Sequence, residues 1–190
     1  EGPRGDAARA RHVWNSLPGG SVGVRDGPTG ASSDHIRITI VGRGGHAAYP
    51  QAAVDTIVIA SEVVLALQTI VSRQLKPTLP AVVSVTKIEG GTTNNVIPPE
   101  VTLLGTVRLY EESARQEVKA RIERLVKGVC EAHGASHRFR YEFAYPVTSN
   151  DPGVTALVRD AAIGVVGAQR VIEHEATMGA EDMSFFFEKV

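Results

Sequence analysis

The sequence predicts an α+β fold, a ferredoxin-like β-α-β-β-α-β domain, between residues 34 and 147. Two long segments, 52–74 and 112–133, carry apolar residues at helical spacing. Four segments rich in β-branched or aromatic residues surround them: one before the first helix, two between the helices and one after the second. This order is typical of a four-stranded antiparallel sheet with two helices on one face.

The first strand and the first helix are joined by a glycine-rich loop. Residues 35–41 alternate, with Ile36, Ile38 and Ile40 on one face. Residues 42–46 then read Gly-Arg-Gly-Gly-His, and Pro50 precedes the helix expected over 52–74. That helix is apolar on more than one face, which predicts that it is buried on two sides.

The second and third strands follow the first helix. Residues 81–88 are mostly β-branched and are followed by Gly90 and Gly91. Residues 101–110 form the third expected strand, and its side chains divide between two faces. Thr106 and Arg108 lie on the face opposite the apolar one, which is formed by Val101, Leu103, Val107 and Leu109.

The second helix and the fourth strand complete the domain. The helix is expected over 112–133, with Gly134 as its stop signal. Its apolar stripe consists of Val118, Ile122, Leu125, Val126 and Val129. The strand over 137–145 places five rings on one face: His137, Phe139, Tyr141, Phe143 and Tyr145.

The flanking segments carry weaker patterns. Residues 1–33 are rich in Gly, Pro and Ser and predict loops with one short strand at 21–24. Residues 146–150 are interpreted as a linker, and a helix is expected over 152–166. The tail from Met178 onward is apolar. We therefore divide the chain into segments 1–33, 34–147 and 148–190.

Composition excludes several classes of function. The chain has 190 residues, with 20 Lys and Arg against 21 Asp and Glu, which does not favour binding to nucleic acid. The longest apolar run, 54–67, is interrupted by Asp55, Ser61 and Glu62, so no membrane span is expected. The single cysteine, Cys130, excludes an internal disulfide framework and suits a reducing cytoplasm, the compartment we expect.

Three polar residues of the expected domain are candidates for substrate binding. His46 follows glycines that let the backbone approach a ligand, and its ring can donate a hydrogen bond to a developing oxyanion. Asn95, in the segment 90–98, offers both a donor and an acceptor. Arg108 can grip a carboxylate through two parallel hydrogen bonds. Taken singly, each also fits an ordinary structural role, as a turn residue or as a solvated arginine on a strand.

Three candidate residues lie outside the expected domain. His12 can ligate a metal, although a lone histidine usually does not. Glu181 and Asp182 can support metal ligands from the outer coordination shell, or they can be ordinary acids at a helix start.

These signals occur in one order along nearly the whole chain. His-x-x-x-x-Leu-Pro-x-Gly begins at His12, and Gly-x-Gly-Gly-His-Ala-Ala-x-Pro contains His46. Gly-Gly-Thr-x-x-Asn-Val-Ile-Pro contains Asn95, Gly-Thr-x-Arg ends at Arg108, and Gly-x-Glu-Asp contains Glu181. Together they resemble the aminoacylase/carboxypeptidase family of dinuclear metallohydrolases, in particular its hippurate, N-acyl-amino-acid and auxin-conjugate amidohydrolase branch.

The resemblance implies a fold and an activity. In that family a ferredoxin-like lid, here 34–147, is inserted into a zinc-peptidase-like α/β catalytic domain, to which 1–33 and 148–190 would belong. The expected function is metal-dependent cleavage of the amide bond of N-acyl amino acids or small peptides. The family uses two divalent metal ions, zinc or manganese, and a homodimer formed through the lid is expected.

The resemblance also implies roles for single residues. His12 matches a metal ligand, and His46 matches the lid histidine that polarises the scissile carbonyl, often in the partner subunit's site. Asn95 and Arg108 match lid residues near the substrate, with Arg108 at its free carboxylate. Glu181 and Asp182 match a segment packed near the catalytic centre, in the outer coordination shell.

The chain also departs from the family pattern. The Cys-Gly-His-Asp metal motif and the final histidine ligand are absent, so a fragment lacking the N-terminal catalytic half is expected. Glu1 matches the end of a Glu-Glu-Gly element and is a candidate ligand, but its spacing to His12 is short by roughly a dozen residues against the family pattern. A non-catalytic binding or dimerisation module left by truncation is therefore an alternative to the amidohydrolase. Single-stranded RNA binding is a weaker one, because the characteristic RNA-recognition signature is missing.

Overall fold

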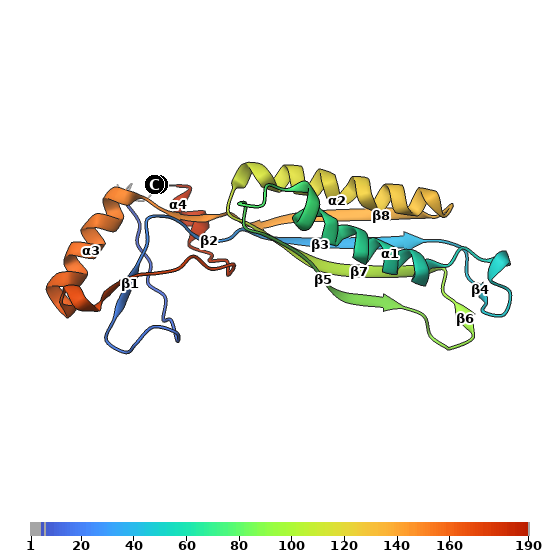
Figure 1. Ribbon diagram of the computed structural model, residues 1–190, viewed down its shortest axis with the longest axis horizontal. Coiled ribbons are helices and arrows are strands. Elements are labelled where there is room, and N and C mark those ends of the chain that lie inside the picture. Colours follow the sequence, from blue (N-terminus) through green and yellow to red (C-terminus); the bar gives the residue numbers. More distant parts are fainter. Residues whose placement is uncertain (1–4, 6, 190) are drawn as a thin grey trace. The chain divides into compact units, whose positions relative to one another are not determined.

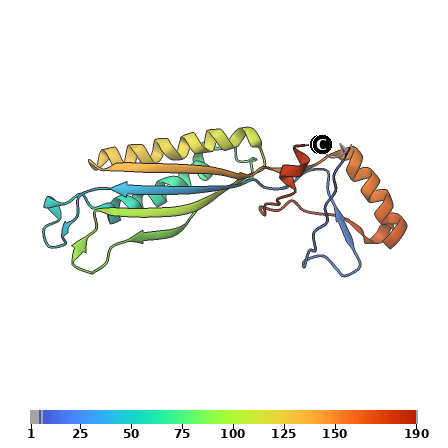
Figure 2. The same ribbon diagram turned by 180° about the vertical axis from the view of Figure 1, so that it is seen from behind.

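The computed structural model describes residue 5 and residues 7–189. The described chain divides into two compact units. Ser33–Ala144 forms one, and the segments before and after it form the other. Figure 1 and Figure 2 show the elements of each unit from opposite sides.

The central unit is built on a four-stranded sheet in the order β5-β7-β3-β8. Its strands are β3 (Ser33–Val41), β5 (Ala81–Gly90), β7 (Glu100–Leu109) and β8 (Ser136–Tyr145). β7 pairs antiparallel with both β3 and β5. Helices α1 (Thr56–Thr69) and α2 (Glu112–Ala132) pack against the same face of the sheet (Figure 1). The predicted ferredoxin-like arrangement is confirmed.

Alternation along the strands decides which side chains meet the helices. On β3 and β7, every second residue is buried in one apolar cluster with α1 and α2. This inward set includes Ile36, Ile38, Ile40, Val101, Leu103, Val107 and Leu109. The predicted faces of both strands are therefore confirmed, and Arg108 lies on the opposite, open face of the sheet.

The first helix differs from its prediction at both ends. It begins at Thr56 rather than 52, because the Asp55 side chain accepts hydrogen bonds from the backbone N–H groups of Ile57 (2.9 Å) and Val58 (3.3 Å) and so caps the helix. Residues Pro50–Ala52 form a separate 3-10 turn. At its C-terminus the helix widens into a π turn over Ile70–Gln74.

Within this chain α1 is buried on one side only, so the expectation of two-sided burial is not met. The inward side contains Ile59, Ala60, Val63, Leu67 and Ile70. The outward side leaves three large apolar side chains exposed: Ile57, Val58 and Leu65. Two-sided burial of this helix would require a surface that the described chain does not supply.

The segment Thr56–Gln74 bears on the expectation that the chain has no membrane span. Its 19 helical residues are long and apolar enough to cross a membrane by length and composition alone, and one third of that stretch is buried inside the protein. The helix contributes its inward side to the core of the sheet. The core helix of a globular domain meets the same criteria, so they carry little weight for a single helix.

The second unit contains two strand pairs, and the sequence patterns predicted one of their four strands, the short strand at 21–24. β1 (Val22–Val24) lies parallel to β10 (Val171–Glu173), and β2 (Gly27–Gly30) lies antiparallel to β9 (Thr148–Asn150). The prediction that 146–150 is a linker was wrong, since most of this segment pairs with β2. The expected helix is confirmed as α3 (Pro152–Val166), and a short helix α4 (Ser184–Phe187) follows the Glu181–Asp182 segment.

Candidate functional site

The glycine-rich loop and the asparagine-rich loop meet at one end of the central sheet. β4 (Gly45–His46) pairs antiparallel with β6 (Val96–Ile97), with His46 opposite Val96. The backbone N–H of Ala47 also donates to the carbonyl of Asn95 at 2.9 Å. We call residues 42–55 and 90–98 together the tip (Figure 1). Two sequence motifs separated by nearly fifty residues thus form a single structure.

Glycine is required at two positions of the tip. A Cβ atom at Gly42 would lie 2.4 Å from the carbonyl oxygen of Val54. At Gly44 it would lie 2.8 Å from the carbonyl oxygen of Ile97. Both distances are shorter than any carbon–oxygen contact that a side chain tolerates. The glycines of the first motif therefore bring the backbone segments of the tip together.

The His46 ring is held in an orientation that suits hydrogen-bond donation. Its Nδ1 accepts a hydrogen bond from the backbone N–H of Ala48 at 3.1 Å. A neutral imidazole that accepts at Nδ1 carries its proton on Nε2. The side chain is exposed, and among the described residues Nε2 has no recorded hydrogen-bond partner. This N–H group is therefore available to polarise a carbonyl oxygen.

Asn95 likewise keeps donor groups that have no hydrogen-bond partner among the described residues. Its side-chain oxygen accepts from the Thr93 hydroxyl at 3.3 Å. The oxygen is thereby engaged, and the amide NH₂ group remains as a donor on an exposed residue. His46 and Asn95 therefore contribute N–H donors at the same end of the domain, as expected of groups that bind a carbonyl or carboxylate.

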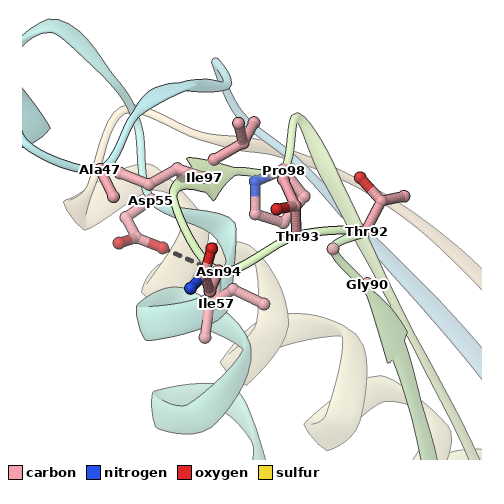
Figure 3. A pocket seen from close by; sticks show the side chains of 11 residues that line it. Ala47, Asp55, Ile57, Gly90, Thr92, Thr93, Asn94, Ile97 and Pro98 are labelled. Atoms are coloured by element: carbon pink, nitrogen blue, oxygen red, sulfur yellow. Dashed lines mark hydrogen bonds between the residues drawn. The ribbon is translucent and has the colours of Figure 1, made fainter.

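A hollow of about 470 Å³ lies on the tip beside the start of α1 (Figure 3). It is lined by Ala47, Asp55, Ile57, Gly90, Gly91, Thr92, Thr93, Asn94, Val96, Ile97 and Pro98. Asp55 is its one charged lining residue, and that carboxylate is engaged in capping α1. A hollow lined in this way fits an uncharged group better than an anion.

Arg108 lies at the opposite end of the sheet from the tip. β7 starts at Glu100, next to the tip, and Arg108 is eight residues further along it. At the usual rise per residue, about 27 Å separates these two positions. The sequence patterns grouped Asn95 and Arg108 as neighbours of one substrate, and within one chain the structure does not bring them together.

Next to Arg108 the sheet covers a buried carboxylate that the sequence patterns missed. The Asp34 side chain is fully buried and accepts hydrogen bonds from two nitrogens of Arg115, at 2.5 and 3.1 Å. The Tyr141 hydroxyl donates to it at 2.7 Å, and the backbone N–H of Ala144 donates at 3.3 Å. Glu112 provides a second partner for Arg115 at 2.5 Å. We call Asp34, Glu112, Arg115 and Tyr141 the base cluster.

The base cluster shifts the proton equilibria of its members. Burial raises the pKa of the Tyr141 hydroxyl, and the hydrogen bond to the Asp34 carboxylate raises it further. Burial opposes the charge on Arg115, but the hydrogen bond and charge of Asp34 outweigh this effect and raise its pKa. The cluster is therefore an ion pair with a neutral tyrosine, and it joins β3, α2 and β8 at their common end.

In the second unit the structure brings His12 and Glu181 together. Nε2 of His12 lies 3.5 Å from a carboxylate oxygen of Glu181. The Trp14 ring packs edge-on against His12 and His174, with centroid separations of 5.6 and 5.1 Å. Asp182 is exposed, and its backbone carbonyl accepts from the N–H of Phe185 at 3.1 Å. A carboxylate beside an imidazole nitrogen is an arrangement that often orients a metal-ligating histidine.

The described residues do not complete a metal site. No group of three or more His, Cys, Asp or Glu side chains with suitable placement occurs within residue 5 and residues 7–189. Glu1, the other predicted ligand, lies outside the described residues. His12 with Glu181 is a smaller donor set than the three or four protein ligands of a typical site.

Comparison with known proteins agrees with the fold. The peptidase dimerisation domain of the M20 family matches residues 31–133, more than half of the chain. The N-acyl-L-amino acid amidohydrolase of Geobacillus stearothermophilus is 45% identical over 149 residues, covering 78% of this chain and 40% of that protein. Thermostable carboxypeptidase 2 of Saccharolobus solfataricus is 35% identical over 179 residues, covering 94% of this chain and 45% of that protein.

A solved structure from the same family resembles this chain. The YXEP protein of Bacillus subtilis, described as a dinuclear metal binding peptidase from the M20 family, superposes with a TM-score of 0.76 at 30% identity. The match covers 94% of this chain and 44% of that one. The chain thus spans less than half the length of these relatives.

Proposed function

Because the chain belongs to the M20 peptidase family, we propose that it is part of a metal-dependent amidohydrolase that cleaves the amide bond of N-acyl amino acids. The names of two relatives, an N-acyl-L-amino acid amidohydrolase and a carboxypeptidase, support this substrate class. Both names describe cleavage of an amide bond next to an amino acid. Small peptides are the related substrates that the same chemistry would accept.

The proposal assigns a distinct task to each predicted residue of the central unit. His46 donates Nε2–H to the oxygen of the scissile carbonyl, where negative charge develops. Asn95 donates its amide N–H groups close by. Arg108 holds the free carboxylate of the amino acid in a bidentate grip. The supporting observation is the bond from the Ala48 N–H to His46, which leaves Nε2 as a donor.

The separation of these residues implies that the site is shared between two copies. An N-acyl amino acid has about the length of two residues, roughly 7 Å when extended. It cannot span the approximately 27 Å of β7 that separates Glu100, beside the tip, from Arg108. We therefore propose that the tip of one copy supplies His46 and Asn95 to a substrate held by Arg108 of its partner.

Two exposed features of the central unit support a homodimer. The outward side of α1 leaves Ile57, Val58 and Leu65 in solvent. β5 is the edge strand next to this helix and pairs on one side only, with β7. A second copy placed against α1 and β5 would bury the helix on its second side, as its apolar pattern predicts, and extend the sheet.

We propose that the second unit is part of the catalytic domain, made of segments 1–33 and 148–190, with 34–147 as the lid. His12 would be a metal ligand with Glu181 as its supporting carboxylate, Asp182 would lie in the outer coordination shell, and Glu1 would be a further ligand. Two divalent ions, zinc or manganese, would supply Lewis-acid activation of a water molecule. Their remaining ligands would come from outside the described residues.

The buried thiol of Cys130 accords with a cytoplasmic location. It lies fully inside the core, where burial raises its pKa and keeps it protonated. We propose a cytoplasmic enzyme, and cell fractionation with an antibody to the protein would test this location.

Subunit complementation tests the shared site. We would co-express two full-length variants, His46→Ala and Arg108→Ala, each inactive alone, and measure hydrolysis of N-benzoylglycine. In a mixed dimer one site receives an intact tip and an intact Arg108, and the other receives neither. Random pairing should then restore about a quarter of wild-type activity.

The outcomes separate the competing interpretations. Absence of rescue, with active wild-type enzyme, would contradict the shared site while leaving the amidohydrolase assignment in place. Absence of hydrolysis by wild-type protein supplied with zinc or manganese, on N-acyl amino acids and dipeptides alike, would favour the non-catalytic binding or dimerisation module. Co-expression of His46→Ala with wild type is the matched control for expression level.

A further inference from the structure

The open face of the central sheet carries more basic than acidic side chains. Its three acidic residues each lie within ion-pair distance of a nearby cation: Glu89 with Lys87 (2.5 Å), Glu100 with Arg138 (2.8 Å) and Glu142 with Arg140 (3.5 Å). Three further basic side chains on the same face form no ion pair among the described residues: His35, Arg37 and Arg108. All three lie on the adjacent strands β3 and β7. Alongside the hydrogen bond from Lys87, Arg37 is nevertheless close enough to Glu89 for its charge to help lower the pKa of that carboxyl group.

The strand register places His35 beside Arg108. His35 is opposite Thr106, and Asp34 is opposite Val107. Arg108 is therefore one position past Val107, and His35 is its diagonal neighbour on the open face. Such neighbours have Cα atoms about 7–8 Å apart, within reach of long side chains.

On the β5 side, Arg108 and Thr106 have small neighbours. On β5 the residue opposite Arg108 is Val82, and the residue opposite Thr106 is Ser84. These side chains are small, and the His35 side chain itself is exposed. The Thr106 hydroxyl donates to the backbone carbonyl of Asp34 at 3.0 Å, so it does not compete for the two basic groups. The exposed His35 and the half-buried Arg108 thus lie on one face with only small side chains beside them on β5.

We propose that His35 binds the substrate carboxylate together with Arg108, a placement that rests on the proposed amidohydrolase function. One carboxylate oxygen accepts from the guanidinium and the other from the imidazole N–H. Arg37 does not take part directly, because it is four residues along β3 from Ser33, the position level with Arg108, or about 13 Å. His35 is accordingly a determinant of specificity for substrates with a free carboxylate.

The experiment compares His35→Gln with Arg37→Gln in the full-length protein. Arg37→Gln is the matched control, because it removes a positive charge from the same strand and face without touching the carboxylate. For each variant we would measure binding of N-benzoylglycine by isothermal titration calorimetry. The kinetics of its hydrolysis would be compared with those of N-benzoylglycinamide, in which a carboxamide replaces the carboxylate.

We expect His35→Gln to weaken binding of N-benzoylglycine by about tenfold, the effect of losing a hydrogen bond to a charged group. KM should rise in parallel, kcat should change little, and the carboxamide substrate should be unaffected. Arg37→Gln should change the dissociation constant by less than about twofold, as expected for a solvated charge outside contact distance.

Binding and turnover distinguish this inference from the proposed function. If His35→Gln impaired hydrolysis of both substrates equally, the role of His35 would be overturned. The same holds if His35→Gln and Arg37→Gln weakened binding of N-benzoylglycine equally. Hydrolysis by wild type with no effect of His35→Gln would overturn it while the amidohydrolase assignment stands. Binding that depends on His35 without any hydrolysis would support the anion site and contradict the enzyme. No binding by wild type would overturn the inference.

Discussion

The base cluster and the tip occupy opposite ends of the same sheet and use polar residues in opposite ways. In the base cluster the Asp34 carboxylate is fully buried and accepts hydrogen bonds from Arg115, Tyr141 and the Ala144 N–H. At the tip His46 and Asn95 are exposed, and each uses one side-chain atom in a local hydrogen bond. Their remaining donor atoms have no partner in the part of the chain that the structure describes. Buried polar groups need hydrogen-bond partners within the protein, whereas exposed ones can be hydrated until a ligand binds.

This difference separates stability from function within one domain. Removing one member of a buried, hydrogen-bonded ion pair lowers the free energy of unfolding strongly, because the other member remains charged and desolvated. Removing an exposed group with few hydrogen bonds changes the free energy of unfolding little, and its loss weakens ligand binding or catalysis instead. The domain should therefore lose stability when a polar residue of the base cluster is replaced, and activity when His46 or Asn95 of the tip is replaced.

The largest effect is expected from Asp34→Ala. The Arg115 side chain is 4% exposed, and the substitution leaves it buried without its main partner. We expect a loss of about 3–5 kcal/mol in the free energy of unfolding, measured by urea denaturation. Glu112→Ala is the control, because that carboxylate is 60% exposed and its removal should cost about 1 kcal/mol or less. Similar losses for both variants would contradict the distinction.

The next effect is on activity. His46→Ala should lower kcat for an N-acyl amino acid by about 10²–10³-fold, the typical cost of losing one oxyanion donor. Its free energy of unfolding, measured in urea, should stay within about 0.5 kcal/mol of the wild-type value, because the side chain is exposed. His133→Ala removes another partly exposed histidine, paired with Glu62 at 2.8 Å, and should leave kcat unchanged. A His46 variant that unfolds would mean that the tip is structural.

Tyr141→Phe probes the pH dependence of the base cluster. At neutral pH the loss of its hydrogen bond to Asp34 should cost about 1.5–3 kcal/mol. Because the pKa of Tyr141 is raised in the folded protein, its contribution is present below the unfolded value of about 10 and is lost as pH rises beyond it. The stability difference between wild type and variant should therefore shrink above pH 10. A constant difference from pH 7 to 11 would contradict this.

The smallest effects compare two glycines. Gly42→Ala would place a Cβ 2.4 Å from the Val54 carbonyl and 2.8 Å from a Thr56 methyl group, so we expect a loss of about 1–3 kcal/mol. Gly128→Ala, on the exposed side of α2 with nothing within 4 Å, should gain up to about 1 kcal/mol. Thermal unfolding of both variants checks the pair. Equal shifts would mean that the tip adjusts to the added methyl group.

Much of the central unit could be predicted because its signals are local. Alternation in 35–41 and 101–110 assigned the inward faces, and Gly134, with φ +69°, ends α2 as expected. The start of α1 was missed because Pro50 and the apolar residues after it resemble a helix start, whereas the Asp55 cap decides the boundary. The pairing of β2 with β9 was also missed, because three- and four-residue strands carry too little periodicity to detect.

The candidate site was predictable only as a set of residues. Motifs singled out His12, His46, Asn95, Arg108 and Glu181, and their roles remain predictions. No pattern pointed to Asp34, Arg115 and Tyr141 as one cluster, since they are separated by up to 107 residues in sequence. His35 carried no signal either, because its position beside Arg108 depends on the register between two strands.

By itself the sequence determined the order of the elements and their inward faces, because side-chain periodicity is set by backbone geometry within each element. It also determined the family, because motif residues keep their spacing along the chain. Only the tertiary structure decided which residues act together. Strand register and helix packing bring Asp34 to Arg115 and His12 to Glu181, and they separate Asn95 from Arg108. Contacts between distant segments depend on the packing of the whole chain, which no local pattern records.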